Sequence, residues 1–214
     1  MLVMLLGSAA ALRELLFHAE VFFGRNADFK GPFAGVIVPA LIVLLGGIGT
    51  LLGSLLTAIL ISPSYGYSVT DSLGRTLEMA GFFSFVYPVL IWVLASFVMY
   101  GVSRLLSGSG TLPATIQNVG YGIFPAGFGF FVMIIGSVVM GLTIPNDGSI
   151  PFYIVVAPSV FLSMLFPVLV IWSIILWVQA ISYTHRISLG NALIAVGASV
   201  IIIFLVNLGG LAFG

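Results

Sequence analysis

Charged residues divide most of this chain into long apolar blocks. After Lys30 only six charged positions occur, at Asp71, Arg75, Glu78, Arg104, Asp147 and Arg186. The charge-free stretches 33–70, 79–103, 105–146, 148–185 and 187–214 each exceed the roughly 20 residues that a helix needs to cross a bilayer. Apolar runs such as LIVLL and VIIIFLV do not alternate as the strands of a membrane barrel do. The pattern predicts an all-α polytopic membrane protein with five transmembrane helices, near residues 33–61, 80–104, 117–143, 153–183 and 190–213.

The first thirty residues follow a different period. Between Ser8, a predicted N-cap, and Gly24, a predicted C′ residue, apolar side chains recur at helical spacing. This segment is predicted to be an amphipathic helix in the cytoplasmic interface. Its candidate membrane-interface residues are Leu15, Leu16, Phe22 and Phe23, with Arg25 and Lys30 near the headgroups. A compatible alternative is that the helix packs under the transmembrane bundle as a structural plug.

The distribution of basic residues predicts the orientation. With the N-terminus in the cytoplasm, one basic residue, Arg75, lies outside and the other five lie inside, as the positive-inside rule requires. The C-terminus is then expected outside or in a lumen. Segment 62–75 is the one long loop that this arrangement predicts. We therefore divide the chain into an N-terminal helix region, 1–31, and a five-helix transmembrane domain, 32–214.

Composition narrows the function classes. Hydrophobic residues make up 61% of the chain and charged residues 6%, which leaves too little polar surface for a soluble globule. The chain has no cysteine and only two isolated histidines, so no metal or haem site of a usual type is expected. No catalytic motif is found, and we expect no enzyme activity, no cofactor and no nucleic-acid partner.

Two segments of the chain resemble each other. PVLIWVLASFVMYGVSR begins at Pro88, and PVLVIWSIILWVQAISYTHR begins at Pro167. Each leads into a cytoplasmic turn and then a span with a glycine, at Gly120 and Gly197 respectively. We hypothesise a duplicated helical hairpin, in which spans two and three match spans four and five.

The third predicted span, QNVGYGIFPAGFGFF, is rich in glycine around a proline. Such residues favour either tight packing against neighbouring helices or a partly unwound element that lines a cavity. Candidates for cavity lining or helix packing are Gly120, Tyr121, Gly122 and Pro125. At the cytoplasmic ends of the spans, the candidates for contact with lipid or a partner are Arg104, Gln117, Asn118, His185 and Arg186. We expect His185 to be solvated or to face the headgroups.

Three motifs together resemble the Yip family of membrane proteins, which is named for interaction with Ypt/Rab GTPases. They are the helix ending in Phe22 and Phe23 followed by DFKGP, the segment YGVSRLLSGSGTLPATIQNVGYGIFP, and the segment WVQAISYTHRISLGNALIAV. The resemblance implies a five-span fold with a cytosolic N-terminus, in agreement with the charge pattern. For eukaryotic relatives it also implies traffic between endoplasmic reticulum and Golgi, membrane shaping and binding of Rab-type GTPases.

The chain departs from those relatives in its N-terminal region, which is about thirty residues here and longer and hydrophilic in them. It is more similar to an archaeal or bacterial type, for which a cell-membrane location is expected. A Rab-type partner is implied only for a eukaryotic member.

The sequence leaves three functional hypotheses. The first is a non-enzymatic membrane scaffold that contacts lipids and a protein partner or a second copy. The second is a transporter or channel for a neutral or apolar solute. The third is an accessory subunit of a larger membrane complex.

Overall fold

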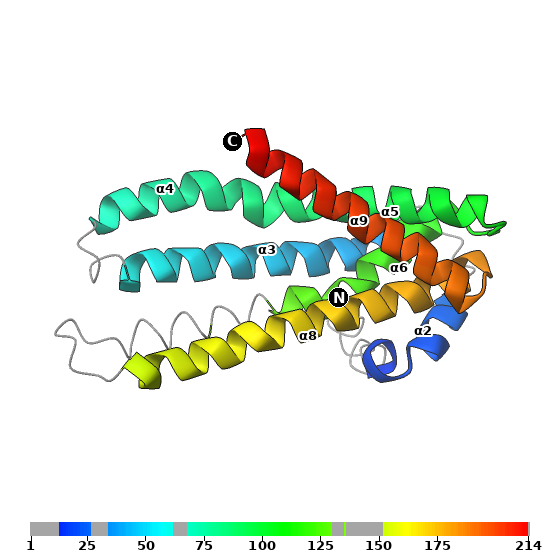
Figure 1. Cartoon of the computed structure of the whole chain (residues 1–214), viewed down its shortest axis with the longest axis horizontal. Helices are drawn as coiled ribbons and strands as arrows, with labels where there is room; N and C mark the ends of the chain where they lie inside the picture. The colour runs from blue at the N-terminus through cyan, green and yellow to red at the C-terminus, as the bar shows by residue number, and fades with distance from the viewer. Residues whose placement is uncertain (1–12, 27–33, 62–67, 130–134, 136–151, 214) are drawn as a thin grey trace. The chain divides into compact units, whose positions relative to one another are not determined.

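A computed structural model describes residues 13–26, 34–61, 68–129, 135 and 152–213 of the chain (Figure 1). Within these ranges the regular structure is entirely helical, which confirms the all-α fold class. Four of the described helices are long and apolar enough to cross a bilayer, with apolar stretches of 18 residues or more at Pro39–Leu56, Ser84–Leu105, Met164–His185 and Leu189–Leu208. They correspond to the first, second, fourth and fifth predicted spans.

The third predicted span, 117–143, lies partly outside the described residues. Its described part begins with α6, Leu112–Gly122, followed by a turn at Ile123 and helical residues 124–129. The count of five spans therefore stays a prediction.

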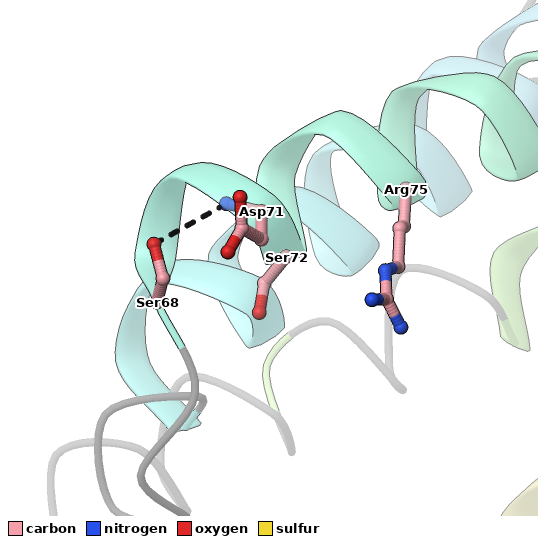
Figure 2. A pocket seen from close by; sticks show the side chains of 4 residues that line it. All are labelled: Ser68, Asp71, Ser72 and Arg75. Atoms are coloured by element: carbon pink, nitrogen blue, oxygen red, sulfur yellow. Dashed lines mark hydrogen bonds between the residues drawn. The ribbon is translucent and has the colours of Figure 1, made fainter.

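Helix α4, Val69–Gly81, corrects the second half of the predicted loop 62–75, of which residues 62–67 lie outside the described part of the chain. Ser68 lies at its start, where the Asp71 N–H donates to the Ser68 Oγ over 3.5 Å (Figure 2). The Ser72 N–H bonds the Ser68 carbonyl at 3.0 Å, so Ser68 is the N-cap. The spacing of Ser68 and Asp71 is a capping signal that predicts a helix start here, and we overlooked it.

We expect Ser68→Ala to weaken the start of α4 by about 1 kcal/mol, because the first-turn N–H groups lose a side-chain acceptor. Amide hydrogen exchange at Asp71 and Ser72 should accelerate about fivefold. Ser72→Ala is the matched control, since it removes a hydroxyl one turn later and leaves the cap in place. Equal exchange in both variants would contradict the assignment of Ser68 as N-cap.

A π-helix, η2, Phe82–Val86, separates α4 from α5, Tyr87–Leu105. Pro88 is the second residue of α5. Because proline has no N–H, the carbonyl of Ser84 loses its usual donor four residues later, and a π-turn shifts the pairing by one residue. The missing donor of Pro88 is thus accommodated by a π-helix.

The remaining long helices are α3, Ala34–Ile61, α8, Phe152–His185, and α9, Leu189–Phe213. The chain forms two compact units, and α3, α5 and α8 each contribute to both. The first unit comprises Met1–Ala40, Leu90–Ile123 and Ile174–Gly214, and the second comprises Leu41–Val89 and Phe124–Ser173. The polar side chains discussed below lie mainly in the first unit.

Helices α5 and α8 end in the same Schellman motif. In each, an N–H just past the helix bonds a carbonyl five residues earlier, and the residue before that N–H adopts a left-handed φ, 65° at Ser107 and 54° at Arg186. The two bonds join Gly108 to Ser103, at 2.8 Å, and Ile187 to Ser182, at 3.1 Å. The two motifs are as far apart in sequence as Pro88 and Pro167.

The helices that follow these motifs also begin alike. Thr111 is the N-cap of α6, where its carbonyl accepts from the Thr115 N–H at 3.0 Å, and Ser188 precedes α9, where its carbonyl accepts from the Ala192 N–H at 2.9 Å. Thr111 and Ser188 are as far apart in sequence as Gly120 and Gly197. These matches support the hypothesis of a duplicated helical hairpin, with a shorter second turn.

Candidate functional site

The candidate site is a buried polar cluster in the first unit, where α6 meets the ends of α5 and α8. Three polar side chains of α6 are almost completely buried, Thr115, Gln117 and Asn118. From α8, Thr184 and His185 are buried as well. We expected Gln117, Asn118 and His185 to contact lipid or a partner from the membrane surface, and their side chains instead face protein.

The ring of His185 bonds α6. Its Nε2 lies 2.8 Å from the Thr115 Oγ1, and the Thr115 hydroxyl donates to the Thr111 carbonyl at 2.9 Å. Because a hydroxyl has one proton, Thr115 can only accept from His185, so the Nε2 of His185 carries the hydrogen. The expectation of a solvated His185 was wrong: its exposed fraction is 0%. Single-sequence periodicity could not show this, since a histidine at a helix end is usually exposed.

One turn further along α6, the Asn118 Nδ2 donates to the Thr184 Oγ1 at 2.7 Å. Neighbouring residues on α6 and α8 are thereby joined by two side-chain hydrogen bonds. Several buried polar atoms in this cluster have no hydrogen-bond partner among the described residues: Ser103 Oγ, Asn118 Oδ1 and His185 Nδ1.

The turn between α5 and α6 wraps around the end of α8. The Ser109 N–H donates to the His185 carbonyl at 3.0 Å. A Cβ at Gly110 would lie 2.5 Å from the Thr184 carbonyl oxygen, and one at Gly108 would lie 2.9 Å from the His185 Cβ. Only glycine lets this turn approach the histidine so closely. The SGSGT segment is a turn, as the sequence predicts, and its glycines are there for packing.

Two tryptophans hold α6 on separate sides. The indole of Trp92, on α5, donates to the Ile116 carbonyl at 2.8 Å, and the indole of Trp177, on α8, donates to the Val119 carbonyl at 2.8 Å. The second bond replaces a missing helix bond. Since the Ile123 N–H turns to the Gly120 carbonyl, the Val119 carbonyl loses its donor four residues later.

Two glycines of α6 leave the space that these indole rings occupy. A Cβ at Gly120 would collide with Pro39 and would lie 2.9 Å from two carbons of Trp92, and one at Gly122 would collide with Trp177. Gly120 and Gly122 are therefore sites of tight helix packing, which is one of the two predicted readings. Pro125 is also buried, and it belongs to the second unit.

The N-terminal helical segment packs onto the same unit. It comprises residues 13–17 and, after His18, helix α2, Ala19–Asn26. Gly24 lies inside α2, so the prediction that it ends the helix was wrong. Phe22 contacts Tyr121 edge to face, with ring centroids 5.1 Å apart, and Gly24 faces the Tyr183 ring.

The apolar face that we assigned to lipid is largely buried in protein. Leu15, Phe22 and Phe23 are at most 5% exposed, and Leu16 is half-buried. The large apolar side chains that this segment exposes are Phe17, at 66%, and Val21, at 51%. The burial favours the plug reading for Phe22 and Phe23, and it moves the candidate lipid contact to two residues that periodicity did not select.

The basic candidates differ in their surroundings. Arg104 is exposed, and its Nη1 donates to the Gly108 carbonyl at 3.0 Å, so it supports the turn. Arg186 is exposed at the left-handed position after α8. Lys30 lies outside the described residues, and Arg25 lies within α2.

In the second unit, a pocket follows the first two turns of α4 and is lined by Ser68, Asp71, Ser72 and Arg75 (Figure 2). One helix and its cap supply all four residues. The pocket is thus a surface hollow that carries both signs of charge.

The buried cluster holds neighbouring helices together through hydrogen bonds. Within the described ranges, no group of three or more histidine, aspartate or glutamate side chains could hold a metal ion. The side-chain hydrogen bonds of the cluster join α6 to α8, and the turn after α5 bonds the end of α8. Their arrangement suits a rigid structural element more than a reaction centre.

The comparisons with known proteins agree with this membrane architecture. The family model of the Yip1 domain matches residues 13–211, which is nearly the whole chain. No curated protein and no solved structure gives a significant match. Since the match covers the N-terminal helix, the buried cluster and the apolar helices together, the chain is an integral membrane protein that belongs to the Yip1 domain family.

Proposed function

We propose that this protein is a non-enzymatic membrane scaffold with five spans, whose N-terminal helix rests in the cytoplasmic interface. The observation that carries the proposal is that some apolar side chains of residues 13–26 are buried in protein while others are exposed. Phe22 and Phe23 anchor the segment to the first unit, while Phe17 and Val21, on either side of His18, are exposed apolar side chains of the same segment. A helix held this way places apolar volume in one leaflet and favours curvature of the bilayer.

The charge pattern supports the orientation within this proposal. Arg104 lies in the last turn of α5 and Arg186 directly after α8, and Gly24 of the N-terminal segment faces the Tyr183 ring near that end of α8. Basic residues at such ends favour the cytoplasmic side and attract anionic lipid headgroups. Labelling of both termini in sealed vesicles tests the topology. Finding them in the same compartment would rule out the five-span arrangement.

We expect Phe17→Ser combined with Val21→Ser to reduce membrane remodelling by at least half, because the N-terminal segment then loses both of its large exposed apolar side chains. The measurement is the fraction of tubulated vesicles at a fixed protein-to-lipid ratio, in bilayers of phosphatidylcholine with an anionic lipid. Leu77→Ser is the matched control, since Leu77 is 54% exposed on α4.

A second readout separates lipid contact from docking. Limited proteolysis of residues 13–26 should not change in the Phe17 and Val21 variant, but it should increase in Phe23→Ser, whose side chain is fully buried. Remodelling by the double variant at the wild-type level would contradict the lipid contact. A wild-type protein that leaves vesicles unchanged would contradict the scaffold itself.

A further inference from the structure

His185 joins the end of α8 to α6 and to turn 106–111, and the scaffold proposal assigns it no role. Three separate interactions converge on this residue. Its carbonyl accepts from the Ser109 N–H, its Nε2 donates to Thr115, and its ring packs on Gly108 and Gly110 of the turn. The conformation of turn 106–111 therefore depends on the histidine.

The second ring nitrogen faces the turn. A Cβ at Gly110 would lie 2.9 Å from the His185 Nδ1, and one at Gly108 would lie 3.0 Å from it. This Nδ1 is buried and has no hydrogen-bond partner among the described residues. As Nε2 already carries a hydrogen, Nδ1 is the atom that a further proton would join.

The closed turn has no place for that proton. An N–H at Nδ1 would be a buried donor without an acceptor, which costs free energy. Two titratable side chains of α5 lie near the His185 ring. The Arg104 guanidinium would repel a positive charge on the imidazole, and the centroid of the Tyr100 ring lies 5.8 Å from that of His185. The other groups around the ring, Thr115 of α6 and the glycines of the turn, carry no charge. Arg186, which follows His185 in the chain, adds another positive charge.

We propose that His185 is a proton-sensitive latch, which keeps turn 106–111 closed when its Nδ1 is unprotonated and releases the turn when that atom is protonated. Opening lets water accept the Nδ1 hydrogen and breaks the Ser109 bond to the His185 carbonyl. Acidification thus changes the surface that the first unit presents at the ends of α5 and α8. This inference stands independently of the scaffold function.

Hydrogen exchange of the reconstituted full chain tests the latch. A solvated imidazole has a pKa of about 6.5. Because the closed turn takes up no proton, the population of the open turn relative to the closed one rises about 30-fold when the pH falls from 7.5 to 5. The Gly108 and Ser109 amides should lose protection by about that factor after correction for intrinsic rates. The Ala192 amide, bonded to the Ser188 carbonyl in the first turn of α9, is the internal control.

In His185→Gln, the Gly108 and Ser109 amides should stay protected from exchange at both pH values, because glutamine offers an N–H to Thr115 and does not titrate. Equal protection of the wild-type amides at pH 7.5 and pH 5 would overturn the proposal. So would the same acid-induced loss in His185→Gln. If that variant does not fold, the wild type still decides: in ¹⁵N-histidine spectra, a His185 ring that titrates while the Ser109 amide remains protected contradicts the latch.

Discussion

Gly120→Ala is expected to destabilise the protein by about 3 kcal/mol, although alanine is the better helix former. The new Cβ would overlap Pro39 and would press on the Trp92 ring, and both neighbours are rigid. The Trp92 indole is moreover held by its bond to the Ile116 carbonyl, so it cannot turn away without losing that bond. Denaturant titration of the purified protein in mixed micelles measures the loss.

Gly101→Ala is the matched control for this prediction. Gly101 lies on α5 in the same unit, and a Cβ there would meet no atom within 4 Å. Its replacement should leave stability unchanged or raise it by up to about 1 kcal/mol, through helix propensity alone. Equal stabilities of the two variants would show that α6 does not pack as tightly as the structure indicates.

Trp177→Phe should cost about 2 kcal/mol, more than Trp92→Phe, although both remove one indole hydrogen bond to α6. The difference follows from where the two acceptors lie. The Ile116 carbonyl is inside α6, where the helix itself supplies a donor, whereas the Val119 carbonyl has lost its donor to the break at Ile123. Phenylalanine at position 177 leaves that carbonyl without a partner.

Thermal unfolding of both variants in the same detergent provides the comparison. Trp92 is the more buried of the two rings, so a loss caused by packing alone would be larger in Trp92→Phe. That order of stabilities would contradict the role of Trp177 as a substitute helix donor. A larger loss in Trp177→Phe would support it.

The hydrophobic pattern predicted the long helices well, because span length depends on local composition and bilayer thickness. The described ends of α8 and α9, at His185 and Leu189, lie within two residues of the predicted boundaries of the fourth and fifth spans. The pattern missed α4, whose charges at Asp71, Arg75 and Glu78 look like a loop. Its capping signal at Ser68 was readable and would have corrected the prediction.

The candidate site was only half predictable. The glycines at 120 and 122 were recognisable as packing residues, since small residues in an apolar helix favour close approach. Asn118 and His185 were candidates for contact with lipid or a partner because polar residues at the end of a span are usually solvated, but both side chains are buried in the described structure. Here each has a hydrogen-bonding partner on the neighbouring helix, and such partners are distant in sequence.

By itself, the amino-acid sequence determined that this is an apolar, helical membrane protein, since hydropathy and helix periodicity are properties of neighbouring residues. The Yip family was indicated separately, by the resemblance of three motifs. Only the tertiary structure decided which face of the N-terminal segment is buried, and it placed Phe23 inside and Phe17 outside. Both are phenylalanines on one short segment, and their roles differ because of what packs against them. The same holds for His185, whose burial comes from Thr115 and a glycine turn far away in the chain.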